Sequence, residues 1–168
     1  MKRLILTRHA KSSWDDPAMP DHDRPLNDRG RAAAVQLGVW LASRGYVPGE
    51  VLCSDALRTR KTWSGLAPAL PGTPILRLKP ALYHAGPDVM LAVLRHADAD
   101  CVMVIGHNPG IAEFAARLVA RAPANDAFQR YPTGATLVCD FVADSWAAIG
   151  FGQGAVMDFV VPSEVVSG

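Results

Sequence analysis

Short aliphatic runs alternate with helical patterns over the first 122 residues, and no other feature of the sequence constrains the fold as strongly. Runs of this kind are typical of strands that are buried on both faces of a sheet. Because strands that alternate with helices are joined by right-handed crossovers, the pattern predicts an α/β fold, a three-layer α/β/α sandwich with a mainly parallel sheet. The runs are RLILT (3–7), EVLCS (50–54), TPILRL (73–78) and CVMVIG (101–106).

Apolar residues at helical spacing fill the intervals between these runs. The first helical pattern ends at Arg44, and the next two cover 55–69 and 87–97. A fourth begins at Asn108-Pro109, which predicts an N-cap followed by the residue preferred at the first helical position. These helices are expected to cover both sides of the sheet.

Three further apolar segments follow a loop that is rich in Pro, Asn and Gly. They span 135–142, 146–152 and 156–161, and we expect them to be late strands, antiparallel at the edge of the sheet. The sequence contains no internal repeat and no low-complexity tract. Residues 1–168 are therefore expected to form a single domain of ordinary size.

The connection after the first run is unusually long. Residues 10–27 are polar and acidic, and they contain three prolines as well as Asp15, Asp16, Asp21 and Asp23. Connections of this length without structure of their own are uncommon in compact domains and are often functional. We expect this loop to shape access to a site.

Charge and composition exclude several classes of function. The 17 Lys and Arg balance 16 Asp and Glu to a formal charge of +1, so neither nucleic acid nor a membrane surface is an expected partner. No apolar stretch approaches the roughly 18 residues of a membrane span, and the N-terminal apolar run is too short for a signal peptide. Cys53, Cys101 and Cys139 lie in apolar stretches and are expected to be reduced core residues. We therefore expect a cytoplasmic protein.

Basic side chains follow three of the predicted parallel strands. Arg8 and His9 come directly after the first strand. Arg58 lies in the first turn of the helix after the second strand, and His107 follows the fourth. Because ligands of open parallel sheets bind beyond the carboxyl ends of the strands, these side chains are expected to meet. Such a cluster repels itself when empty and is favourable around a compact dianion, so the pattern indicates a phosphate site.

The residues alone leave the purpose of that site open. A single histidine at a strand end is more often a hydrogen-bonded surface residue than a catalyst, and the same arginines could hold a phosphorylated partner without turnover. Two histidines that face one anion favour chemistry, since Arg or Lys would bind without titrating. Other hydrolase classes fit poorly, because the chain has no G-x-S-x-G motif and no pair of histidines at zinc-ligand spacing.

Four motifs connect this chain to a known family. They are RHA (8–10), RPLNDRG (24–30), SDALRTRKT (54–62) and IGHNPG (105–110). In this order they resemble the histidine phosphatase superfamily, whose fold is shared with the cofactor-dependent phosphoglycerate mutases, and most closely the SixA-type phosphohistidine phosphatases. The resemblance implies one histidine phosphatase-like domain and phosphatase activity without a metal or another cofactor.

The resemblance also assigns roles by matching position. It makes His9 the nucleophile that becomes phosphorylated, while Arg8, Arg58 and His107 would hold the phosphoryl oxygens. An imidazole with a pKa of about 6.5 can act as a neutral nucleophile near pH 7, and a covalent intermediate divides transfer to water into two displacements. The surrounding cations would stabilise charge on the equatorial oxygens, as a magnesium ion does elsewhere.

Three residues within or near the matched motifs are expected to bind the substrate. These are Ser12, Asp15 and Asn108. One departure lies beside the nucleophile, where many superfamily members have Gly and this chain has Ala10. Alanine is tolerated there if the backbone has a negative φ.

A second departure concerns the proton donor. The segment LYHA (82–85) lacks the carboxylic acid that larger relatives present after their third strand, and Asp15, His84 and Asp88 are the remaining candidate donors. An alkyl phosphate expels an alkoxide nearly as basic as hydroxide, whose conjugate acid has a pKa of about 15.7. Phosphohistidine expels a far less basic imidazole. A site without a strong general acid therefore suits phosphohistidine better than sugar phosphates.

We therefore expect a phosphatase that hydrolyses phosphohistidine on a protein, through a covalent phosphohistidine at His9. The alternatives are a small-molecule phosphomonoesterase of the same fold and a non-catalytic phosphate-binding module. A mutase is less compatible, because retaining a bisphosphate intermediate usually requires a lid, for which this chain has little room.

Overall fold

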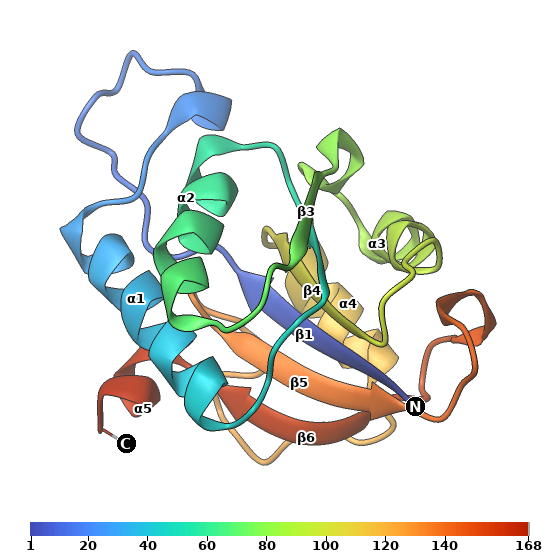
Figure 1. The fold of residues 1–168 in the computed structure, drawn as a ribbon. Helices are drawn as coiled ribbons and strands as arrows, with labels where there is room; N and C mark the ends of the chain where they lie inside the picture. Colours follow the sequence, from blue (N-terminus) through green and yellow to red (C-terminus); the bar gives the residue numbers. More distant parts are fainter. Residues whose placement is uncertain (168) are drawn as a thin grey trace.

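The computed structural model describes residues 1–167, which form a mixed sheet of six strands (Figure 1). In spatial order β3, β2, β4 and β1 are parallel, whereas β5 pairs antiparallel with β1, and β6 antiparallel with β5. The predicted α/β fold, with a mainly parallel sheet and antiparallel late strands, is confirmed. The strands are β1 (Lys2–Arg8), β2 (Glu50–Cys53), β3 (Ile75–Leu78), β4 (Cys101–Gly106), β5 (Thr136–Phe141) and β6 (Ala155–Val160).

Two layers of helices cover the sheet (Figure 1). Successive side chains of β1 point to opposite faces, so that Leu4 and Leu6 pack with α3 and α4, while Ile5 packs with α1 and α2. The short α5 lies beside α1. The helices are α1 (Asp28–Ser43), α2 (Leu57–Leu66), α3 (Pro87–Leu94), α4 (Gly110–Leu118) and α5 (Pro162–Ser167), with short 3-10 helices η1 (Asp21–Asp23), η2 (Ala67–Ala69), η3 (Pro80–Leu82) and η4 (Trp146–Ala148).

The prediction of a strand over 146–152 is wrong. The segment contains η4 followed by turns, and Trp146 is buried with its indole N–H donating to the carbonyl of Ala99 at 2.6 Å. Arg95 donates two hydrogen bonds to the carbonyl of Ile149. The apolar residues of this segment pack a loop against the core. The pattern of hydrophobicity along the chain does not distinguish such a loop from a strand.

Two further details differ from the prediction. β3 was expected to be buried on both faces, but all of its residues are exposed, because it is an edge strand that pairs with β2. The fourth helix begins at Gly110, after both Asn108 and Pro109. Asn108 still contributes to the helix start, since its Oδ1 accepts a hydrogen bond from the N–H of Ala112 at 3.2 Å.

The connection from β1 to α1 is anchored at its base and projects beyond the sheet (Figure 1). A bridge between Ser12 and Leu26 closes the base. Gly30 lies against it so tightly that a Cβ at this position would be 2.0 Å from the carbonyl oxygen of Lys11. The glycine that ends the RPLNDRG motif therefore lets the loop pack on the first turn of α1.

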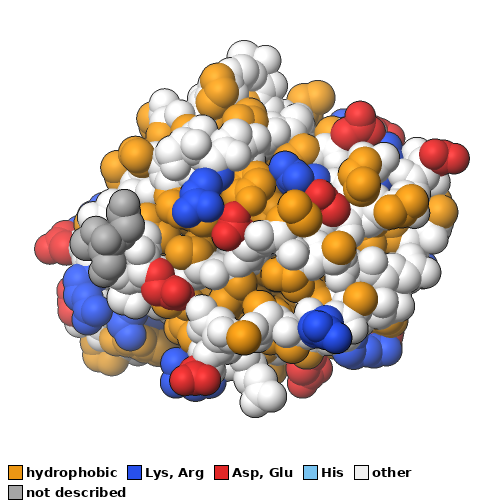
Figure 2. Space-filling view, turned by 90° about the horizontal axis from the view of Figure 1, so that it is seen from below, with side chains coloured by type: hydrophobic (Ala, Val, Ile, Leu, Met, Phe, Trp, Pro, Cys, Tyr) orange, Lys and Arg blue, Asp and Glu red, His pale blue; other side chains and the backbone are white. Residues whose placement is uncertain are grey.

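Charges of both signs are interspersed with hydrophobic side chains on the face seen in Figure 2. This mixture agrees with the formal net charge of +1. Within residues 1–167, no helix combines the length and the apolar character needed to span a bilayer.

Candidate active site

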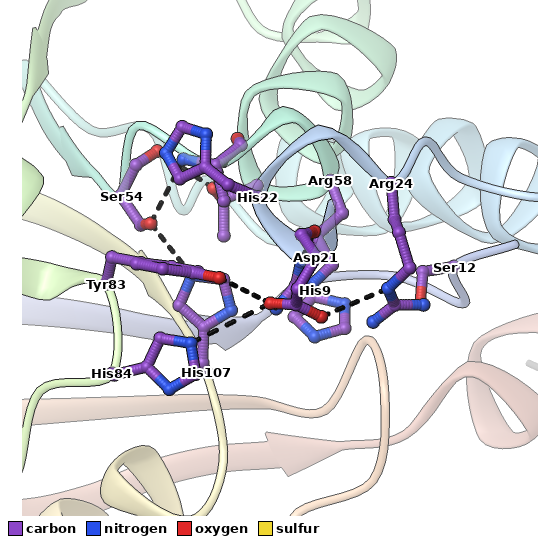
Figure 3. Close-up of polar contacts among 12 residues, drawn as sticks. His9, Ser12, Asp21, His22, Arg24, Ser54, Arg58, Tyr83, His84 and His107 are labelled. Atoms are coloured by element: carbon purple, nitrogen blue, oxygen red, sulfur yellow. Dashed lines mark hydrogen bonds and ion pairs between the residues drawn. The ribbon is translucent and has the colours of Figure 1, made fainter. Parts of the chain in front are cut away.

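The basic side chains that follow the parallel strands line one cavity at the carboxyl ends of β1, β2 and β4. The cavity has a volume of about 230 Å³, and its walls include Arg8, His9, Arg58 and His107. The spatial order β2-β4-β1 brings these three segments side by side, although they are far apart in the sequence (Figure 3). The ring centroids of His9 and His107 are 5.3 Å apart.

His9 is held as a neutral imidazole with a defined tautomer. Its ring Nδ1 lies 2.7 Å from the carbonyl oxygen of Ala10. Because a carbonyl can only accept, Nδ1 carries the proton and Nε2 keeps its lone pair. Burial is the main cause that lowers the pKa of His9 to about 3; the hydrogen bond to Ala10 acts against it, and the charges of Arg8 and Arg58 act with it. The ring is therefore unprotonated at Nε2 near neutral pH.

His107 is oriented by a buried serine. Ser54, at the end of β2, is fully buried, and its Oγ lies 2.8 Å from Nε2 of His107. The same Oγ accepts a hydrogen bond from the N–H of Ala56. The hydroxyl group of Ser54 therefore donates its own proton to Nε2 of His107. The proton of neutral His107 then lies on Nδ1. Burial has the largest effect on His107, and together with the electrostatic interactions with His9 and Arg58 it lowers the pKa of His107 to about 3.

The two arginines are fixed by hydrogen bonds but repel each other. Arg8 donates from Nη1 to the carbonyl of Tyr131 at 3.2 Å. Arg58 donates from Nη1 to the carbonyl of Asp21 at 2.8 Å and from Nη2 to its Oδ2 at 3.0 Å. Burial and the charge of Arg58 both lower the pKa of Arg8. The effect of Arg58 is the repulsion expected between neighbouring cations.

Three buried donors in this cluster have no hydrogen-bond partner within the described part of the chain. They are Nε of Arg8, Nε of Arg58 and Nδ1 of His107, and all belong to residues that line the cavity. An unpaired buried donor costs about 1–3 kcal/mol, so such groups are rare and call for an explanation. A phosphoryl group, with several acceptor oxygens and a double negative charge, is chemically complementary to donors of this kind.

A carboxylate from the long loop completes the cluster. Asp21 in η1 accepts hydrogen bonds from Arg58, from Arg24 at 3.1 Å and from the hydroxyl of Tyr83 (Figure 3). Burial alone would raise the pKa of Asp21, but the hydrogen bonds from Tyr83, Arg58 and Arg24 hold it well below the usual range. Asp21 is thus a permanent anion that anchors Arg58, and it is not a proton donor near neutral pH.

The structure brings two of the three expected substrate-binding residues to the cavity. Ser12 and Asn108 both line it. The hydroxyl of buried Ser12 accepts a hydrogen bond from Nη1 of Arg24 at 2.9 Å, and the amide of Asn108 donates to the carbonyl of Arg130 at 2.8 Å. Asp15 is exposed on the loop and is not among the lining residues, so the structure does not bring it to the cluster.

The other candidate proton donors also lie outside the cavity wall. Asp88 is an exposed residue of α3 that forms an ion pair with Arg117 at 3.6 Å. His84 is closer, because its ring is stacked on that of His107 with centroids 6.4 Å apart, and its Nε2 is 3.7 Å from Oδ2 of Asp21. It lies at the rim and is exposed.

Sequence reasoning did not single out Asp21, Ser54 or Tyr83 as part of the site. Asp21 was noted only as one of several acids in the loop, and its spacing of three residues before Arg24 was the one local signal available. Ala10, where many relatives have Gly, has no positive φ, and its N–H donates to Oγ1 of Thr62 at 2.9 Å. The alanine is therefore accommodated without backbone strain.

Comparison with known proteins gives a consistent result. The model of the histidine phosphatase superfamily (branch 1) matches residues 4–82. An uncharacterized protein of Mycobacterium tuberculosis is 32% identical over 162 residues, which cover 92% of this chain and 99% of that protein. An uncharacterized chloroplastic protein of Arabidopsis thaliana is 38% identical over 128 residues, 70% of this chain, and the match spans 59% of that protein's length.

Solved structures extend the comparison to the whole fold. A structure from Nakamurella multipartitia, described as a candidate phosphohistidine phosphatase SixA, matches with a TM-score of 0.80 and 31% identity, covering 96% of both chains. A second SixA candidate, from Agrobacterium tumefaciens, matches with a TM-score of 0.77 and 27% identity, covering 96% of this chain and 98% of the other. The chain belongs to the histidine phosphatase superfamily.

Proposed function

We propose that this protein is a phosphatase that hydrolyses phosphohistidine on a protein, through a covalent phosphohistidine at His9. The observation that carries the proposal is the set of three unpartnered buried donors on the residues around His9. In this proposal Arg8, Arg58 and His107 bind the phosphoryl oxygens, and Ser12 and Asn108 contribute to substrate binding from the same wall. The cations supply the positive charge for transfer, so the proposal includes no metal and no cofactor.

The chemistry consists of two displacements at phosphorus. Nε2 of His9 attacks, the bond from phosphorus to the substrate nitrogen breaks, and its electron pair leaves on the substrate imidazole, which takes a proton from solvent. Water then attacks the phosphorylated His9, the bond from phosphorus to Nε2 breaks, and inorganic phosphate leaves. The hydrogen bond from Nδ1 to Ala10 keeps the ring in one tautomer through both steps.

The preference for phosphohistidine rests on the leaving group. Among the described residues, no aspartate or glutamate lines the cavity, and the neighbouring Asp21 is ionised. An alkoxide needs a proton donor as it leaves, whereas an imidazole with a pKa of about 6.5 does not. These features support phosphohistidine over small phosphomonoesters such as sugar phosphates.

The proposal also covers the organisation and location of the protein. Residues 1–168 are proposed to be one histidine phosphatase-like domain, and the position of β1 and β6 in the same sheet supports this. A cytoplasmic location is proposed because Cys53, Cys101 and Cys139 are free thiols, which suits a reducing compartment.

A labelling experiment tests the nucleophile. Wild type, His9→Ala and His96→Ala are exposed briefly to labelled phosphohistidine and quenched in base; His96 is an exposed histidine outside the cavity and serves as the matched control. We expect an acid-labile, base-stable label on wild type and on His96→Ala and none on His9→Ala. Equal labelling of wild type and His9→Ala would falsify the assignment.

Substrate comparison separates the alternatives. Faster hydrolysis of phosphohistidine than of p-nitrophenyl phosphate supports the proposal. Strong turnover of a sugar phosphate would instead assign the protein to the small-molecule phosphomonoesterases, and binding of phosphohistidine without turnover would assign it to the non-catalytic modules.

A further inference from the structure

A groove adjoins the proposed catalytic cavity and shares part of its wall. It has a volume of about 310 Å³ and lies between α1 and the start of α5, which are neighbours in the fold (Figure 1). Lys11 and Thr133 line both spaces, so these two residues separate the groove from the cavity. Other lining residues are Arg29, Ala33, Gln36 and Pro162.

Two cations of the groove have no counterion among the described residues. Neither Lys11 nor Arg29 has an ion pair or a side-chain hydrogen bond with any residue of the described chain, and both are exposed. Nearby arginines are different: Arg31 is paired with Asp28, and Arg24 with Asp21. No Asp or Glu is among the described residues that line the groove. The groove is therefore complementary to negative charge.

The surroundings favour a peptide as the source of that charge. Two cations in a chain with a formal charge of +1 do not form the extended basic face that nucleic acid or a membrane requires. The lining also contains small apolar groups, Ala32, Ala33 and Pro162, against which a peptide backbone can pack. An extended chain advances about 3.3–3.6 Å per residue, so a carboxylate two or three residues from a phosphohistidine can reach a groove that adjoins the cavity.

We propose that Lys11 and Arg29 select protein substrates in which Asp or Glu lies two or three residues from the phosphohistidine. This inference rests on the proposed function, because it names the sequence context that the catalytic site receives. Lys11 lies where the two spaces meet, whereas Arg29 lines only the groove. Arg29 is therefore the residue at which the selection can be changed without altering a side chain of the cavity wall.

Three phosphohistidine peptides of equal length test the proposal, with Glu, Gln or Lys at the flanking positions. For wild type we expect kcat/KM to be highest for the Glu peptide, intermediate for the Gln peptide and lowest for the Lys peptide. At low salt the values for the Glu and Lys peptides should differ by about tenfold. The difference should shrink as salt is raised, because exposed charges are screened. Arg29→Glu should reverse the order, so that the Lys peptide becomes the best substrate.

Arg121→Glu is the matched control, since Arg121 is exposed, follows the C-terminal end of α4 and lines neither space. It introduces the same change of net charge and should leave the wild-type order intact. Equal rates for the three peptides in wild type, or an unchanged order in Arg29→Glu, would overturn the groove proposal and leave the phosphohistidine proposal standing. Hydrolysis of p-nitrophenyl phosphate without hydrolysis of any of the peptides would overturn both.

Discussion

Replacement of Ser54 by alanine isolates the role of one hydroxyl group in the proposed site. Ser54 lies behind His107 and is fully buried, so the substitution removes the donor to Nε2 without exposing the ring to solvent. Without that donor His107 can place its proton on Nε2 and turn the lone pair of Nδ1 toward the phosphoryl group. An attractive N–H contact with the transition state is then replaced by repulsion.

The magnitude follows from the bonds that are lost. A hydrogen bond to a charged group is worth about 1.5–3 kcal/mol, and about 1.4 kcal/mol corresponds to a factor of ten in rate, so kcat should fall about 10- to 100-fold. The buried N–H of Ala56 and Nε2 of His107 also lose their partner, which should cost about 1–3 kcal/mol of folding free energy. For 168 residues this lowers the melting temperature by about 2–10 °C.

The assay combines kinetics on p-nitrophenyl phosphate, thermal unfolding and nitrogen NMR of the His107 ring. Thr59→Ala is the matched control, because it removes another buried hydroxyl in the same turn, one that donates to the carbonyls of Ser54 and Ala56 and does not bond to the imidazole. We expect a similar loss of stability in both variants, with the kcat loss and the change of tautomer confined to Ser54→Ala. An unchanged kcat with Nδ1 of His107 still protonated in Ser54→Ala would show that the hydroxyl of Ser54 does not set the tautomer of His107.

Two further predictions concern the arginine and the histidines of the site. Arg58→Ala should lower kcat/KM by about 10²- to 10³-fold with little loss of stability, because Asp21 keeps Arg24 and Tyr83 as partners; a large drop in melting temperature would instead show a structural arginine. Because the folded pKa values of His9 and His107 are about 3, the unfolded chain binds more protons between pH 6.5 and 3, and stability should fall as pH decreases through this range. The slope is up to about 1.4 kcal/mol per pH unit for each histidine, so denaturant titrations at several pH values should show a shallower fall for His9→Asn, and equal slopes would contradict the assignment.

Much of the architecture was predictable because it depends on local pattern. The aliphatic runs over 3–7, 50–54 and 101–106 are buried parallel strands. Such runs can bury the apolar side chains on both of their faces only in a sheet that is covered by helices on both sides. The strand predicted at 73–78 is also present, but its exposure to solvent was not predicted. Whether a strand lies at the edge of a sheet depends on which other strands pair with it, and its own sequence does not show this.

The segment 146–152 shows the limit of the same reasoning. Its apolar residues were interpreted as a strand, yet Trp146 reaches back to the carbonyl of Ala99 and holds a loop. Burial of an aromatic side chain is equally favourable in either arrangement, so composition alone does not choose between them.

For the site, the order of the amino acids is enough to locate the chemistry-bearing residues near the ends of predicted strands. Arg8 is the last residue of a parallel strand, and His9 and His107 each follow one. Because parallel strands end at one edge of the sheet, the proximity of these residues follows from topology. The orientation and the hydrogen-bond partners of each group become visible in the folded chain alone. Asp21 anchors Arg58 and Ser54 orients His107, and these contacts join residues separated by 37 and 53 positions. Hydrogen bonds of such range depend on loop paths and side-chain packing, which carry no periodic signal in the sequence.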